Sequence, residues 1–159
     1  MDYILQLMVL LFGFVFGYII YELTRHRAGG VIAIPILVLY TMEAPIILPV
    51  FIYAIAMCLL IGNIIQEKTL VYGRRLLYLY LTVSIICTSS AFFFVMYLLD
   101  INLLAISVGA IFPGLIAYNL SREAYSFKSG LTSVGWMAWH FMIVGLFGIV
   151  ILLASGWRP

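Results

Sequence analysis

Charge is scarce in this sequence. Only 9% of its 159 residues are Asp, Glu, Lys or Arg, whereas 66% are hydrophobic. So few polar groups cannot cover a water-facing globule of this size, and the chain is therefore expected to use lipid as its solvent. The formal net charge of +2 says little about partners, because the position of each charge matters more than the sum in a membrane protein. We expect no nucleic-acid partner.

Motifs for independent chemistry are also missing. Phosphate-binding patterns such as GxxxxGK[ST] and GxGxxG are absent, and the His, Asp and Glu residues show no metal-ligand spacing. Cys58 and Cys87 lie inside apolar runs without CxxC spacing, which predicts packing roles. We therefore expect no catalytic residue, metal site or cofactor in this chain, and no enzyme activity of its own.

The sequence instead contains six apolar runs, which predict an all-α integral membrane protein with about six transmembrane helices. Helices are expected because backbone groups in lipid must find their partners within the protein. The runs cover residues 4–21, 31–42, 46–65, 76–99, 101–120 and 131–154. Run 31–42 is short for a hydrocarbon core of ~30 Å and contains Pro35, which on length alone favours a re-entrant segment.

The positive charges favour six complete crossings. Seven of the eight Lys and Arg residues lie in three loops, which alternate with loops that carry only Glu43 and Asp100; they are Arg25, Arg27, Lys68, Arg74, Arg75, Arg122 and Lys128. Six crossings place all seven on one side, which the positive-inside rule makes cytoplasmic. The prediction is a multi-pass plasma-membrane protein with both termini outside.

The two halves of the chain contain similar segments. Residues 30–40 and 108–118 align on Pro35 and Pro113, 78 residues apart. This favours a single transmembrane domain, 1–159, made of two three-helix repeats, about 1–70 and 71–159. The second repeat would be inverted, because three is an odd number of crossings. The alternative is a chance likeness, since proline and glycine are frequent in membrane helices.

The prolines mark the first candidate site. Proline removes a backbone donor and clashes with the preceding turn, so Pro35 and Pro113 are expected to break the second helix of each repeat. Gly109 and Gly114 lie on either side of Pro113. We expect these four residues to line a path or a partner-binding groove through the bundle. A kink that only improves packing is the alternative.

The second candidate is an anion- or partner-binding site in the basic loops, made of Tyr72, Gly73, Arg74, Arg75, Arg122 and Lys128. Adjacent guanidinium groups can bind carboxylates or phosphates with paired donors, and arginine stays charged at any relevant pH. The alternative is that these cations only anchor the helices to anionic lipid head groups.

Two features of the apolar runs leave their roles open. Gly13-Phe-Val-Phe-Gly17 is a small-xxx-small pattern, which permits close helix contact within one subunit or in a homo-oligomer. His140 is an ionisable residue in the last run, where proton handling and packing are both conceivable, and packing is favoured because tryptophans surround it.

Two blocks carry a family resemblance. Val71-Tyr-Gly-Arg-Arg75 and Gly109-Ala-Ile-Phe-Pro-Gly-Leu-Ile-Ala117, in this order and with this helix spacing, resemble the CapC or PgsC family. Its members are small membrane subunits of bacterial and archaeal poly-γ-glutamate synthesis and capsule systems. The likeness extends over nearly the whole chain. The chain departs from the family at Pro35-Ile36, where the family's first copy tends to have Pro-Gly.

The resemblance implies a division of labour. A cytosolic ATP-dependent glutamate ligase, with its own ATP and divalent metal, would polymerise glutamate. This chain, with other small membrane subunits, would support polymerisation and the passage of the polyanion outward. Arg74 and Arg75 would then contact the polymer or the ligase, and Pro113 with Gly114 would shape the route.

Two other functions are compatible with the sequence. One is a membrane scaffold for an ATP-grasp-type ligase that acts on another product. The other is a small secondary transporter built from inverted repeats. The absence of an acidic residue well inside any apolar run disfavours proton or sodium coupling, and therefore the transporter.

The predicted topology can be tested by cysteine labelling. Single cysteines introduced along residues 66–75 should react with a membrane-impermeant thiol reagent only in opened cells, because this loop is predicted to be cytoplasmic. A cysteine at Ala44, in a loop predicted to be external, should react in intact cells. Labelling of 66–75 from outside would overturn six crossings with external termini.

Overall fold

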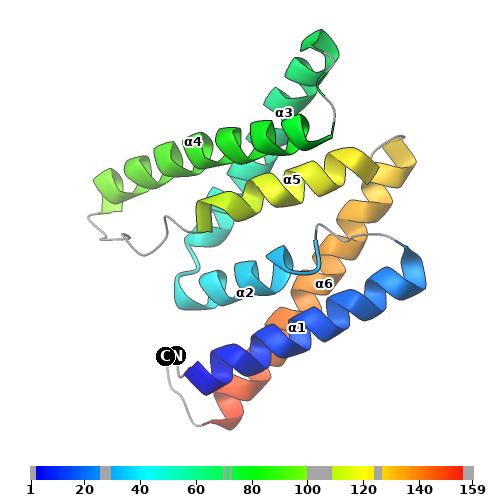
Figure 1. Ribbon diagram of the computed structural model, residues 1–159. Coiled ribbons are helices and arrows are strands. Elements are labelled where there is room, and N and C mark those ends of the chain that lie inside the picture. The colour runs from blue at the N-terminus through cyan, green and yellow to red at the C-terminus, as the bar shows by residue number, and fades with distance from the viewer. Residues whose placement is uncertain are drawn as a thin grey trace. The chain divides into compact units, whose positions relative to one another are not determined.

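The described part of the chain is helical. The computed structural model describes residues 3–25, 30–69, 71, 73–99, 109–123 and 127–155. Its helices are α1 (Tyr3–Thr24), α2 (Ala33–Glu43), α3 (Ile47–Thr69), α4 (Arg74–Leu99), α5 (Phe112–Glu123) and α6 (Phe127–Ala154) (Figure 1). These residues contain no strand, which confirms the predicted all-α fold class.

Four helices have the length and composition of membrane spans, namely α1, α3, α4 and α6. They expose large apolar side chains such as Phe93, Phe94 and Leu153, which lipid would cover. By contrast, α2 has 11 residues and α5 has 12. At 1.5 Å per residue each is only about 17–18 Å long, too short to cross a ~30 Å core as a helix alone. The chain is thus a membrane protein with four helices of spanning length, and six crossings stay a prediction.

The helices form two compact units. Unit 1 contains Met1–Pro45 and Glu123–Pro159, and therefore α1, α2 and α6. Unit 2 contains Ile46–Arg122, and therefore α3, α4 and nearly all of α5. Each unit combines two long helices with one short helix.

In unit 1, two glycines let α1 lie close to both of its neighbours. A Cβ atom at Gly13 would come within 2.6 Å of Pro35 on α2, and one at Gly17 within 2.7 Å of the His140 ring on α6. His140 is fully buried, and its Nε2 lies 3.0 Å from the Gly13 carbonyl oxygen. A carbonyl oxygen can only accept, so Nε2 is the donor. The Gly13–Gly17 pattern therefore serves contacts within the chain, and His140 packs against α1.

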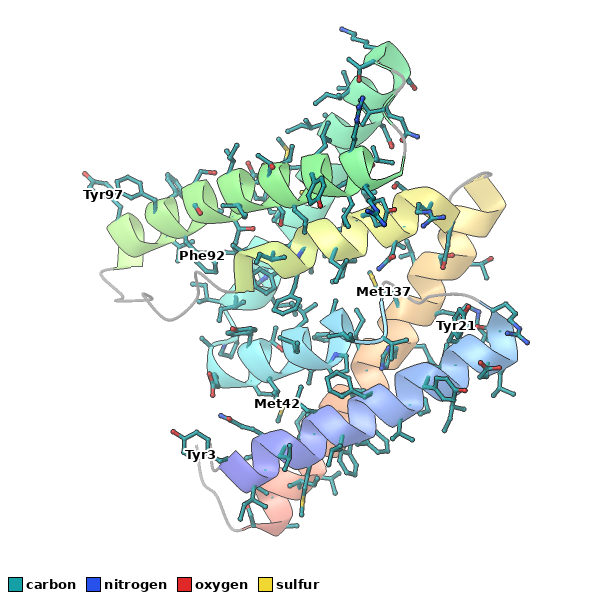
Figure 2. All side chains as sticks on the ribbon, in the orientation of Figure 1. Tyr3, Tyr21, Met42, Phe92, Tyr97 and Met137 are labelled. Carbon is teal, nitrogen blue, oxygen red and sulfur yellow. The ribbon has the colours of Figure 1, made fainter. Side chains whose placement is uncertain are left out.

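The short helix α2 lies along the first half of α1. Near the start of α2, Pro35 contacts Gly13 of α1. At its end, Glu43 accepts a hydrogen bond of 2.9 Å from the Gln6 side chain of α1. Near this end, Met42 (Figure 2) contacts α6, where a Cβ at Gly148 would lie 2.7 Å from the Met42 sulfur. Thus α2 begins beside the middle of α1 and runs antiparallel to it.

The prolines lie in the first turns of the short helices. Pro35 is the third residue of α2 and Pro113 is the second residue of α5. A proline is tolerated there because the first N–H groups of a helix have no partner within it. The predicted break within a longer helix is therefore wrong for Pro35, because residues 31–32 form a turn before α2 begins. Most of run 101–120 that precedes Pro113 lies outside the described residues.

The glycine contact in unit 1 predicts a stability difference. Gly17→Ala should push α6 away from α1, because its new Cβ would overlap the His140 ring, and overpacking costs about 1–3 kcal/mol. Gly145→Ala is the matched control, since a Cβ at Gly145 meets open space. The free energy of unfolding in mild detergent measures both variants. Equal stability of the two would contradict the close packing of α1 on α6.

Candidate functional site

Tyr80, which is fully buried on α4, fixes the register between α3 and α4. A Cβ at Gly62 of α3 would lie 2.6 Å from the Tyr80 hydroxyl oxygen, so the absence of a side chain makes room for the ring. Phe51, near the start of α3, meets Phe92, near the end of α4, with ring centroids 6.3 Å apart (Phe92 is labelled in Figure 2). The two helices therefore run antiparallel, and the end of α3 lies beside the start of α4.

The short helix α5 is also antiparallel to α4, as Figure 1 shows. Gly114, near the start of α5, lies against Ser84. One turn further along α5, the Tyr118 ring meets the Tyr80 ring at 64° with centroids 6.2 Å apart. The end of α5 therefore also lies beside the start of α4.

Cations extend from all three helices at this end of unit 2. On α3, Lys68 follows Gly62 by six residues, and on α4, Arg74 precedes Tyr80 by six residues. On α5, Arg122 follows Tyr118 by four residues. At 1.5 Å per residue they lie about 6–9 Å beyond Tyr80 along their helices. Lys68, Arg74, Arg75 and Arg122 are all exposed. We call these four residues the basic end.

The start of α4 strengthens the positive potential of the basic end. Gly73 has a φ of 64°, a left-handed conformation that glycine adopts without steric cost. Its carbonyl oxygen accepts the Leu77 N–H at 3.3 Å, so α4 begins directly after it. The first N–H groups of a helix and its dipole favour an anion. Neither Arg74 nor Arg75 has an ion-pair partner among the described residues.

Arg122 is held over an aromatic ring. Its guanidinium carbon lies 5.7 Å from the centroid of the Tyr118 ring, and its side chain donates a hydrogen bond of 3.4 Å to the Tyr118 hydroxyl. Both contacts leave most of the guanidinium donors free for another group. Arg25 of unit 1 differs, because it lies 3.7 Å from the Glu22 carboxylate.

Ser84 connects α4 to the segment where α5 begins. Its hydroxyl donates to the Ala110 carbonyl oxygen at 2.6 Å and accepts the Gly114 N–H at 2.8 Å. The hydroxyl thus lies between two backbone groups that bond directly to each other in a regular α-helix. Gly114 permits this approach, because a Cβ there would lie 2.6 Å from the Tyr80 carbonyl oxygen. Ser84 is fully buried.

Comparison of the sequence with known protein families identifies one family. The family model for capsule biosynthesis CapC matches residues 12–127, most of the chain. The chain belongs to the capsule biosynthesis CapC family. Searches of curated proteins and of solved structures found no match. The match confirms the resemblance that the two sequence blocks indicated, and it includes all of unit 2.

The structure of this CapC-family chain brings part of each predicted site together. In the basic site, Gly73, Arg74, Arg75 and Arg122 lie at one end of unit 2, whereas Tyr72 and the side chain of Lys128 lie outside the described residues. In the predicted path, Gly109, Pro113 and Gly114 lie around the start of α5 in unit 2, and Pro35 lies in unit 1. The roles of these residues in binding stay predictions.

A group of polar α4 residues was not predicted from the sequence, and two of them, Tyr80 and Ser84, contact α5 or the segment before it. Tyr80, Ser84 and Thr88 are four residues apart and fully buried, so they form one polar face of α4. This spacing within an apolar run was visible in the sequence. The backbone groups that Ser84 binds were not visible, because the sequence does not show where α5 begins or which backbone groups there lack a helical partner.

Gly114→Ala should destabilise the CapC chain more than a typical helix substitution. The new Cβ would meet the Tyr80 backbone carbonyl, which cannot rotate away as a side chain can, so we expect a loss of about 2–3 kcal/mol. Gly135→Ala is the control, since a Cβ at Gly135 meets open space. Unfolding in detergent measures the difference. A Gly114 variant as stable as the control would show that α5 does not lie this close to α4.

Proposed function

We propose that this CapC-family chain is a non-catalytic integral membrane subunit of a poly-γ-glutamate synthase and export complex. A partner ligase, carrying ATP and a divalent metal, would form the amide bonds on the cytoplasmic side. This chain would support polymerisation and the passage of the polyanion outward. The family match supports a role in capsule synthesis, and the basic end is the observation that favours an acidic product.

The basic end suits a polyanion rather than a small anion. Its four cations come from three different helices, so they present a broad surface. A polymer with one carboxylate per residue can contact several cations at once, and each contact raises the effective concentration for the next. Attraction to the exposed cations falls off within roughly 8 Å at physiological salt, so the polymer has to lie on the surface to be held.

The proposal includes six crossings with both termini outside. Arg122 lies at the same end of unit 2 as Lys68, Arg74 and Arg75, which six crossings require. If run 101–120 turned back to the side it came from, Arg122 would lie at the opposite end of α4. The antiparallel contacts of α5 with α4 therefore support the positive-inside assignment of these two loops.

The proposal also includes two repeats that exchange their third helices. Unit 1 contains the first and second helices of the first predicted repeat and the third helix of the second. Unit 2 contains the converse set. In both units the short helix begins beside the middle of the long helix before it, with a proline in its first turn. This correspondence supports a repeated origin better than the two prolines alone.

A membrane scaffold for the ligase is the second candidate function. Tyr80, Ser84 and Thr88 have no exposed surface, so the polar face of α4 is packed rather than open to water. A single copy therefore favours anchoring over conduction, and a route would need further copies or partner subunits. Copurification of a ligase without transport of polymer into vesicles would support the scaffold.

The basic end can be tested in cells. Arg74→Ala with Arg75→Ala should abolish surface polymer while the chain still inserts, because the variant loses two guanidinium groups that have no ion-pair partner among the described residues. Arg74→Lys with Arg75→Lys should keep much of the output if charge dominates. Arg25→Ala removes a cation that Glu22 already pairs and serves as the control. Normal polymer from the double alanine variant would remove the role of these arginines.

A further inference from the structure

We propose that Ser84 is a positioning residue, which sets where Arg122 stands relative to Arg74 and Arg75. The inference rests on the proposed function, because it explains how one polar group far from the surface controls the basic end. Ser84 itself, fully buried, touches no polymer.

Ser84 differs from Thr82 and Ser90 of α4 in what it binds. Thr82 donates to the Tyr78 carbonyl oxygen at 2.8 Å, and Ser90 donates to the Cys87 carbonyl oxygen at 2.9 Å, both within their own helix. Ser84 instead uses its donor and its acceptor on the segment before and at the start of α5. It therefore joins two helices, whereas these bonds of Thr82 and Ser90 stay within α4.

This bridge fixes how far α5 reaches. Arg122 lies eight residues after Gly114, about 12 Å along a continuous helix. A slip of α5 by one turn would move Arg122 by about 5.4 Å. That shift is comparable to the roughly 8 Å range of electrostatic attraction in physiological salt, so it would weaken joint binding by Arg122 and the arginines of α4.

Loss of the hydroxyl favours such a slip. Without Ser84, the Ala110 carbonyl and the Gly114 N–H would lose the hydroxyl that separates them, at a buried position where water cannot replace it. These two groups are four residues apart, the spacing of a direct bond in a regular α-helix, so they would bond to each other. Closing this turn would move the start of α5 along α4, because the hydroxyl no longer holds the turn open at its position. The Tyr80–Tyr118 ring contact alone is not directional enough to hold the helix in register.

The test is a double-mutant cycle on the purified chain in discs of uncharged lipid, with poly-γ-glutamate of defined length as the probe. Ser84→Ala should weaken polymer binding about fivefold, close to the loss from Arg122→Ala. The double variant should be no weaker than Arg122→Ala alone, because Ser84 acts through Arg122. Ser90→Ala is the matched control and should bind like the wild type.

Amide hydrogen exchange supplies a second measurement. Ser84→Ala should speed exchange in residues 109–123 more than in α3, where the Cys58 thiol also lies near Ser84, whereas Ser90→Ala should change neither. If Ser84→Ala fails to insert, Ser84→Cys keeps the volume with a weak donor and should show the same effects at reduced size.

Two results would overturn the positioning role. One is wild-type binding by Ser84→Ala, and the other is full additivity of Ser84→Ala with Arg122→Ala. A different result would reject the proposed function itself: no binding of the polymer by the wild type, or no effect of Arg122→Ala. The cycle thus separates failure of the positioning role from failure of the basic end.

Discussion

Backbone groups in lipid must be satisfied within the protein, and the short helices depend on how this is done. Helix α5 is too short to cross alone, so the groups at its start need partners beside the middle of α4. Ser84 supplies both a donor and an acceptor there. Gly114 lets the two backbones approach closely enough for these bonds to form.

The contacts inside unit 2 decide what its end presents. Because Tyr80 fits against Gly62 and meets Tyr118, the end of α3, the start of α4 and the end of α5 lie together. The cations of two separate loops therefore share one end. The family has a role in capsule synthesis, and the basic end would bind the product if that product is acidic. Catalysis would remain with a partner ligase, which this chain would meet at the same side.

The broad features of the fold were predictable from the sequence, because they depend on local composition. Apolar runs of sufficient length require helices in lipid, and the two motif blocks were enough to indicate the family. The role of Pro35 was predicted incorrectly. A proline disrupts the interior of a helix but is tolerated in its first turn. The sequence does not show where the helix begins when the turn before it is as apolar as the helix.

Features that depend on distant contacts could not be predicted. The arginines of 74–75 were found because adjacent guanidinium groups are rare in so apolar a chain. Ser84 was not found, since its function follows from two backbone groups about 26–30 residues later in the chain. The association of α6 with α1 and α2, and of α3 with α4 and α5, likewise depends on contacts such as His140 with Gly13, which are 127 residues apart.

In the proposed function, an acidic polymer binds at the basic end through several charges at once. The most direct measurement is the affinity of the purified chain, in uncharged lipid, for poly-γ-glutamate as salt is raised. Multivalent charge attraction predicts a steep loss of affinity with salt and little competition from free glutamate. Binding that is insensitive to salt, or equal affinity for monomer and polymer, would contradict it.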